Sequence, residues 1–283
     1  MKIIQSPQEM QEISAGLRIS KNTIGFVPTM GALHQGHLSL IQKCRKENDT
    51  AVVSIFVNPI QFGPSEDYQK YPRSLPQDKK LLESVSADFL FVPEANEMFP
   101  FGYQTKITVE SLSAPLCGKF RPGHFQGVAT IVMKLFHIVI PTRAYFGEKD
   151  YQQFRIIKQM AADLNLPVEI LPCPTAREPD GLAVSSRNQY LSTLERKHAP
   201  LVYQSLLEGG KLVEKKEKKP EVIRTAVIKK LQESSLISIE YVEIVHPETL
   251  VPVREIDETV LLALAVRIGK TRLIDNLMIQ PAS

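Results

Sequence analysis

Two short apolar runs flank a helical segment near the start of the chain, and this arrangement constrains the fold more than any other feature of the sequence. Residues 23–27 and 51–57 are short and rich in β-branched and apolar side chains, which predicts strands buried on both faces. Residues 36–47 between them have the periodicity of a helix. A strand, a helix and a second strand in this order predict a βαβ unit with its two strands parallel in one sheet.

The same alternation continues through the middle of the chain. Apolar side chains at 128–139 recur with a helical period, residues 143–147 predict a strand, and residues 154–164 predict a further helix. Such alternation predicts an α/β fold: a Rossmann-like, doubly wound parallel sheet with helices on both faces. Ligands bind beyond the carboxyl ends of the strands in sheets of this kind, so the chemistry is expected in the loops that follow strands.

A second domain is expected after the Pro-Cys-Pro sequence at 172–174. Residues 194–207 predict helix, and residues 237–245 and 259–268 predict strands that pair in a small α+β module. The charged run at 211–219 is interpreted as a solvated helix surface or linker and not as a nucleic-acid patch. We therefore predict domains at 1–175 and 176–283.

Charge, hydropathy and cysteine spacing exclude several classes of protein. The 34 basic and 31 acidic residues are too evenly balanced for a dedicated nucleic-acid binder. The start of the chain lacks the apolar core of a secretory signal, and no later run approaches a membrane-spanning length, so we expect a cytoplasmic protein with no membrane partner. Cys44, Cys117 and Cys173 are odd in number and widely spaced, which predicts buried free thiols.

The strongest motif is residues 28–37, PTMGALHQGH, which follows the first predicted strand and runs into the helix. Gly31 and Gly36 allow close approach of a ligand to the backbone, and the N–H groups at the helix start point toward any phosphate held there. His34 and His37 could both hydrogen-bond phosphate oxygens and stabilise charge developing at an α-phosphorus. Two histidines one turn apart can also ligate zinc, but the glutamate of HExxH is missing. The loop context favours a nucleotide.

The second predicted strand ends in a turn that carries two side-chain amides, those of Asn58 and Gln61. Amides can donate to a carboxylate and exchange hydrogen bonds with hydroxyl groups, which suits a polyhydroxy acid. Taken alone, an Asn-Pro-x-Gln turn is as consistent with a structural turn as with a binding site.

A third loop, the FGEKDYQQ sequence at 146–153, closes a strand and opens a helix. Lys149 in this loop can supply a mobile positive charge to ATP phosphates. Arg121, in the Arg-Pro-Gly-His-Phe sequence, could offer a planar fork to a carboxylate or a phosphate, although an isolated arginine more often has a structural role.

A fourth loop, DGLAVSSRN at 180–188, places two hydroxyl groups and a guanidinium together near the expected domain junction. Ser185, Ser186 and Arg187 could hold a departing pyrophosphate.

These strings resemble the pantothenate synthetase family over nearly the whole chain. The HxGH pattern is shared by nucleotidylyl-transferring α/β enzymes, whereas PTMGALHxGH is far more specific to this family. The sequences at 146–153, 180–188 and 267–276 match it as well. Val184 stands where the family often has methionine, at a contact made largely through backbone and apolar atoms.

The resemblance implies a set of site residues. His34, His37 and Lys149 would take part in catalysis, and Gln61, supported by Asn58, would hold pantoate and β-alanine. Gln153 would contact pantoate, and Arg121 is assigned to the substrates as well. The residues expected to bind ATP are Pro28, Thr29, Met30, Gly31, Gly36, His37, Gly147, Glu148, Lys149, Asp150, Ala176, Val184, Ser185, Ser186 and Arg187.

The resemblance also implies the reaction, an ATP-dependent condensation of pantoate with β-alanine to pantothenate. AMP and pyrophosphate would be released by way of a pantoyl-adenylate intermediate. Mg²⁺ would bridge phosphate oxygens of ATP, and no protein ligand of the metal is identified. Members of the family are usually homodimers, so a homodimer is expected here.

Two alternatives remain at this point. A nucleotidylyltransferase that keeps its adenylated product shares the HxGH pattern, but the amide turn at 58–61 and Arg187 argue against it. A non-catalytic ATP- or RNA-binding module with 211–219 as its basic face is the other. Retention of His34, His37 and Lys149 argues against this second alternative.

Overall fold

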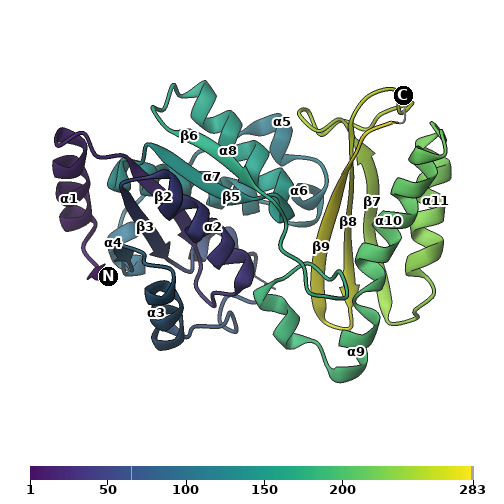
Figure 1. The fold of residues 1–283 in the computed structure, drawn as a ribbon, viewed down its shortest axis with the longest axis horizontal. Helices are drawn as coiled ribbons and strands as arrows, with labels where there is room; N and C mark the ends of the chain where they lie inside the picture. Colours follow the sequence, from purple (N-terminus) through teal and green to yellow (C-terminus); the bar gives the residue numbers. More distant parts are fainter. Residues whose placement is uncertain (65, 282–283) are drawn as a thin grey trace. The chain divides into compact units, whose positions relative to one another are not determined.

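The computed structural model describes residues 1–64 and 66–281, and it divides the chain into two compact units (Figure 1). The first unit comprises Met1–Ser113, Arg121–Glu148 and Gln153–Pro174. The second comprises Ala114–Phe120, Lys149–Gln152 and the chain from Thr175 onward. Two short segments that come early in the sequence therefore belong to the C-terminal unit.

A six-stranded parallel sheet forms the centre of the first unit, with the strand order β1-β4-β3-β2-β5-β6. Its strands are β1 (Lys2–Ile4), β2 (Ile24–Thr29), β3 (Thr50–Ile55), β4 (Phe89–Phe91), β5 (Arg143–Gly147) and β6 (Glu169–Cys173). The chain runs from β2 through β3 and β4 toward one edge, and from β5 to β6 toward the other. The order therefore reverses between β2 and β5, which is the switch point where doubly wound sheets bind ligands.

Helices pack on this sheet in two groups. Helix α2 contacts β2, β3 and β5, whereas α1 and α7 contact each other and β2. The helices of this unit are α1 (Pro7–Ile19), α2 (Gln35–Glu47), α3 (Leu75–Ser84), α4 (Ala95–Met98), α5 (Glu110–Ser113), α7 (His124–Val139) and most of α8 (Tyr151–Asp163), with the 3-10 turn η1 (Pro59–Gln61). The 3-10 turn η2 (Glu148–Asp150) begins in this unit and ends in the second. Among the described residues, no helix has the length and apolar character that crossing a membrane would require. The predicted Rossmann-like α/β fold is confirmed.

The second unit contains a three-stranded antiparallel sheet in the order β7-β8-β9. Helices α10 and α11 pack together and contact the sheet. Its elements are α6 (Cys117–Phe120), η3 (Ser186–Tyr190), α9 (Thr193–His198), α10 (Leu201–Glu214), α11 (Pro220–Leu231), β7 (Ile237–Val245), β8 (Val260–Ile268) and β9 (Thr271–Ile279). An apolar core that includes Leu206, Val227 and Leu264 lies between the helices and the strands. The predicted small α+β module is confirmed.

The structure refines the predicted elements at several places. The helix expected at 194–207 is two helices, because the chain breaks between α9 and α10 at Ala199 and Pro200. The charged run at 211–219 ends α10 and leads to α11, and its lysines are exposed, as expected for a solvated surface. The strands β1, β4, β6 and β9 were not predicted. The three cysteines are buried free thiols, as predicted.

Candidate active site

The loop after β2 has a backbone conformation fixed by two polar side chains. Thr29 donates its hydroxyl to the carbonyl oxygen of Ser54 over 2.8 Å and accepts the N–H of Gly31 over 3.1 Å. Gly31 has a φ of 78°, and a Cβ there would lie 3.0 Å from Ile55 and 3.1 Å from Asp78. The positive φ favours glycine at this position, and a Cβ would be tightly packed against both neighbours.

Asp78 of α3 holds the next part of this loop. Its carboxylate accepts the N–H of Ala32 over 3.0 Å and that of Leu33 over 2.7 Å, and the residue is only 2% exposed. Burial raises the pKa of Asp78, opposed by these two hydrogen bonds. Sequence reasoning did not identify Asp78, because a lone aspartate in a predicted helix gives no local signal of a partner so distant in the chain.

The two histidines stack at the start of α2. His34 is the residue that precedes the helix, His37 lies in its first turn, and their ring centroids are 4.0 Å apart with an interplanar angle of 31°. Both side chains are partly buried. The positive end of the helix dipole and its N–H groups therefore lie at the same place as two imidazole rings, a combination suited to an anion.

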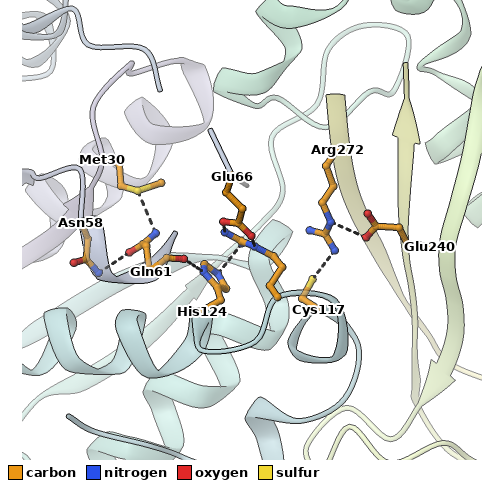
Figure 2. Close-up of polar contacts among 9 residues, drawn as sticks. Met30, Asn58, Gln61, Glu66, Cys117, His124, Glu240 and Arg272 are labelled. Carbon is orange, nitrogen blue, oxygen red and sulfur yellow. Dashed lines mark hydrogen bonds and ion pairs between the residues drawn. The ribbon is translucent and has the colours of Figure 1, made fainter. Parts of the chain in front are cut away.

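The amides of Asn58 and Gln61 are bonded to each other and to their surroundings, as Figure 2 shows. Asn58 Nδ2 donates to Gln61 Oε1 over 3.0 Å and to the carbonyl oxygen of Gly127 over 3.1 Å. Gln61 Nε2 in turn lies 3.2 Å from the sulfur of Met30. The amide turn after β3 thus touches the loop after β2. Both Asn58 and Gln61 are buried.

The turn is also held from the side of α7. Gly127 is required here, because a Cβ would lie 2.4 Å from the carbonyl oxygen of Ile60 and 2.7 Å from Gln61 Cα. His124 Nδ1 lies 2.9 Å from the carbonyl oxygen of Gln61, and its Nε2 lies 2.8 Å from Arg121 Nη1. Because a guanidinium nitrogen only donates, Nε2 accepts and Nδ1 carries the proton that is donated to Gln61.

Arg121 forms a two-pronged ion pair with Glu66. Arg121 Nε and Nη2 donate to the two carboxylate oxygens of Glu66 over 2.7 and 2.6 Å (Figure 2). Burial favours a higher pKa for the Glu66 carboxyl, but the hydrogen bonds and charge of Arg121 outweigh it, so the pKa is lowered. The carboxylate that Arg121 contacts is therefore one from the protein itself, and contact of Arg121 with a substrate stays a prediction.

The remaining predicted residues of the first unit lie at the end of β5 or just after it. Gly147 ends that strand, Glu148 follows it, and Gln153 lies in the first turns of α8. Because β5 pairs in parallel with β2, its carboxyl end lies at the same edge of the sheet as the histidine loop.

In the second unit, the turn that carries Lys149 is fixed by β9. Asn276 Nδ2 donates to the carbonyl oxygen of Lys149 over 3.0 Å. The Lys149 ammonium lies 3.7 Å from Asp150, and its side chain is 20% exposed. The Lys149 side chain is therefore partly shielded from solvent and lies close to a carboxylate of its own turn.

The loop at 176–188 in the same unit has a defined structure. The N–H of Val184 donates to the carbonyl oxygen of Ala176 over 2.9 Å, beside an antiparallel bridge between Arg177 and Ala183. Ser185 precedes η3 and its hydroxyl accepts the N–H of Arg187 over 3.3 Å. The hydroxyl groups and the guanidinium predicted to bind pyrophosphate thus lie on a turn whose backbone is held by hydrogen bonds.

Each unit therefore assembles its own group of predicted site residues. The first unit places the loop at 28–37 and the amides of Asn58 and Gln61 at one edge of its sheet, and the second holds Lys149 and the loop at 176–188. Their joint binding of one triphosphate stays a prediction. No group of three or more histidine, cysteine or acidic side chains within residues 1–64 and 66–281 is arranged to hold a metal ion.

Comparison with known proteins gives consistent matches over the whole chain. The sequence model of the family described as pantoate-beta-alanine ligase matches residues 2–278. The pantothenate synthetase of Thermosipho africanus is 53% identical over 279 residues, covering 99% of this chain and 100% of the relative. That of Thermotoga neapolitana is 54% identical over 276 residues, covering 98% and 99%.

Solved structures agree with this result. The crystal structure of pantothenate synthetase from Thermus thermophilus superposes with a TM-score of 0.94 at 45% identity, covering 99% of this chain and 100% of that one. Pantoate-beta-alanine ligase from Francisella tularensis, complexed with beta-gamma ATP and beta-alanine, has a TM-score of 0.82 at 38% identity and covers 98% and 97%.

Proposed function

The chain belongs to the pantoate-beta-alanine ligase family, and on that premise we propose how its residues carry out the ligase reaction. The reaction is the ATP-dependent condensation of pantoate with β-alanine to give pantothenate, AMP and pyrophosphate. One observation carries the assignment of residues: the amide of Gln61 lies against Met30 of the histidine-bearing loop. A group suited to an acid substrate and a loop suited to a nucleotide are thereby adjacent.

In the first step, a pantoate carboxylate oxygen attacks the α-phosphorus of ATP. A new P–O bond forms, the bond to the β-phosphate breaks, and pyrophosphate leaves with the electron pair. His34 and His37 donate hydrogen bonds to phosphate oxygens at the start of α2, and Lys149 balances the charge of the triphosphate. Ser185, Ser186 and Arg187 hold the departing pyrophosphate.

In the second step, the amine of β-alanine attacks the acyl carbon of the adenylate. The C–N bond forms, a proton leaves the amine, and AMP departs with the electrons of the acyl–oxygen bond. Gln61 and Gln153 orient pantoate in the first step and its pantoyl group in the second, and Asn58 orients Gln61. The remaining contacts to ATP are assigned to the backbone of Pro28–Gly31 and Gly36, to 147–150, and to Ala176 and Val184.

Mg²⁺ is proposed to enter with ATP and to be coordinated by phosphate oxygens and water. When bound, the ion would neutralise phosphate charge during adenylate formation.

Further proposals concern the organisation of the protein. Residues 1–175 are proposed to bind ATP and pantoate, and residues 176–283 to act as a lid and to be associated with the dimer. A homodimer is expected by resemblance to the family, and sedimentation velocity tests it. The cytoplasmic location stays a prediction from the sequence.

The decisive experiment separates the two half-reactions. Purified protein with ATP, Mg²⁺ and pantoate should exchange labelled pyrophosphate into ATP without β-alanine, and AMP release should then require β-alanine. Exchange that ignores pantoate would contradict adenylation of this acid. AMP or adenylate release that ignores β-alanine would instead indicate a nucleotidylyltransferase that keeps its adenylated product.

A further inference from the structure

Two consecutive residues of β9, Asp275 and Asn276, each bind one of the two loops that the second unit contributes to the proposed ATP site. Neither residue is itself among the proposed ligands of ATP or pantoate. Both lie in a strand whose neighbours in the sheet are fixed by antiparallel pairing, with Asp275 opposite Leu264 and Asn276 opposite Ala263. Their side chains therefore project from a rigid part of the fold.

Asp275 holds the loop at 176–188 through Arg177. Its carboxylate accepts from Arg177 Nη1 over 2.6 Å and from Nη2 over 3.0 Å, and Asp275 is only 3% exposed. Arg177 Nη1 also donates to the carbonyl oxygen of Gly181 over 3.1 Å, and its guanidinium lies 3.7 Å from the ring centroid of Tyr203. A buried, two-pronged ion pair of this kind fixes direction as well as distance. The loop is consequently anchored at its base and at its Gly181 turn.

Asn276 holds the Lys149 turn through a hydrogen bond from its Nδ2 to the carbonyl oxygen of Lys149 over 3.0 Å. The same residue contributes its carbonyl oxygen to Arg177 Nη2 over 3.5 Å, and its N–H lies 2.8 Å from Asp275 Oδ1. Two adjacent residues of β9 thus hold both the Lys149 turn and the loop at 176–188 by hydrogen bonds.

We propose that Asp275 and Asn276 are positioning residues that set the spacing between the Lys149 turn and the Ser185–Arg187 loop. This inference rests on the proposed function of those two loops in binding the triphosphate. Because catalysis by positioning loses rate steeply when charged groups are displaced, the pair should govern the use of ATP and not the binding of pantoate.

The test uses two substitutions at Asn276 that remove the donor but preserve its approximate shape. Asn276→Asp places an acceptor against the carbonyl oxygen of Lys149, and Asn276→Leu removes the donor without adding charge. Asn96→Asp, on the exposed surface of α4, is the charge-matched control. Kinetics are measured for pantoate-dependent exchange of pyrophosphate with ATP, and separately for conversion of supplied pantoyl adenylate and β-alanine to pantothenate.

Both Asn276 variants should lower kcat/KM for ATP about tenfold, since one hydrogen bond to the backbone is lost. The KM for pantoate and the turnover of supplied adenylate should stay within about twofold, because the adenylate has no β- or γ-phosphate. The control should match the wild type. Equal losses in all of these parameters would mean a general loss of folded enzyme and would overturn the proposal, as would unchanged kcat/KM for ATP.

Failure of the proposed function is recognised separately, because the wild-type chain would then show no pantoate-dependent exchange. Calorimetry with α,β-methylene ATP, in which the bond between the α- and β-phosphates cannot be cleaved, measures the effect of Asn276 on nucleotide binding without turnover. About tenfold weaker binding in both variants supports the positioning role, and unchanged binding overturns it. Asp275→Asn serves as a further variant, but the conclusion does not depend on it because loss of a buried ion pair can prevent folding.

Discussion

Asp78 accepts the N–H of Leu33 over 2.7 Å, so that a carboxylate from α3 fixes the loop between β2 and α2. The same carboxylate accepts the N–H of Ala32, a non-glycine residue with a φ of 50°. The left-handed conformation of Ala32 is thus stabilised by a partner elsewhere in the fold. The position of the histidine pair depends on this contact, since His34 follows directly.

Replacing Asp78 with alanine should destabilise the protein by about 2 kcal/mol, because the N–H groups of Ala32 and Leu33 lose their acceptor. Urea unfolding measures this free energy, and kcat/KM for ATP should fall as well. Asp78→Asn, which keeps one acceptor oxygen, should have a smaller effect on both. Equal stability of Asp78→Ala and the wild type would show that solvent replaces the carboxylate.

Removing the side chain of His34 or of Lys149 should slow adenylate formation without unfolding the protein. His34→Ala removes a proposed phosphate donor, and Lys149→Ala removes a proposed counter-charge. Each should lower the single-turnover rate of adenylation by about a hundredfold, the scale of losing one transition-state donor. Circular dichroism should be unchanged. Wild-type single-turnover rates in both variants would refute these roles.

Asn58→Ala should raise the KM for pantoate about tenfold with little change in the KM for ATP, because Gln61 loses the donor that orients its oxygen. Steady-state kinetics with each substrate varied in turn decides this. A selective rise in the KM for ATP would mean that the amide turn serves the nucleotide instead.

Gly127→Ala should push η1 away from α7, since the added methyl group would lie 2.4 Å from the carbonyl oxygen of Ile60. Overpacking of this kind costs about 1–3 kcal/mol, and weaker binding of pantoate should accompany it. Gly16→Ala, in α1, is the matched control, because nothing lies within 4 Å of a Cβ there. A variant as stable as Gly16→Ala, with unchanged affinity for pantoate, would contradict the tight packing at Gly127.

The ion pair of Glu66 with Arg121 should stabilise the protein in a pH-dependent manner. The pKa of Glu66 is lowered in the folded state, so the stabilisation is fully present above the unfolded value of 4.5 and is lost as pH falls through the folded pKa. Glu66→Gln should cost about 2 kcal/mol at pH 7 and progressively less below pH 4.5. Urea unfolding of both proteins from pH 7 to pH 3 measures the difference. A constant difference across that range would exclude linkage to this carboxyl.

Local periodicity predicted the central strands β2, β3 and β5 of the parallel sheet, but it did not reveal the strands β1, β4 and β6 or the long-range polar contacts. The strand at 143–147 was predicted with its observed bounds, because it is short, apolar and flanked by clear breaks. The strand predicted at 23–27 corresponds to β2, which continues through Pro28, a residue that the prediction assigns to the following loop. The carbonyl oxygens of Thr23 and Thr29 accept hydrogen bonds from the side of β3, whereas that of Ile24 accepts one from Thr142, on the side of β5. Because backbone groups alternate along a strand, the backbone nitrogen of Pro28 faces β5. The pairing of β2 with β5 covers only Gly25 and Phe26, so the missing N–H of Pro28 costs no hydrogen bond between strands.

Strand β9 escaped prediction for a related reason. Its buried face includes Thr271 and Asp275 next to Leu273, so the alternation of apolar and polar residues is interrupted by a buried carboxylate. That carboxylate is tolerated because Arg177 pairs with it, and only the folded structure reveals the pair. The loop motifs were recognised from their strings. Asn276 lies in the recognised string at 267–276, but that string does not reveal its contact with Lys149, and Asp78 lies in none of the strings.

The division of the chain has a practical consequence for cutting it. A C-terminal fragment beginning at Thr175 would lack 114–120 and 149–152, which the compact C-terminal unit contains. Asn276 would then lose the carbonyl oxygen of Lys149, and Tyr241 would lose the thiol of Cys117 that lies 3.2 Å from its hydroxyl. Proteolysis or gene splitting at that point should thus yield a C-terminal fragment that lacks these contacts and is not an independent folding unit.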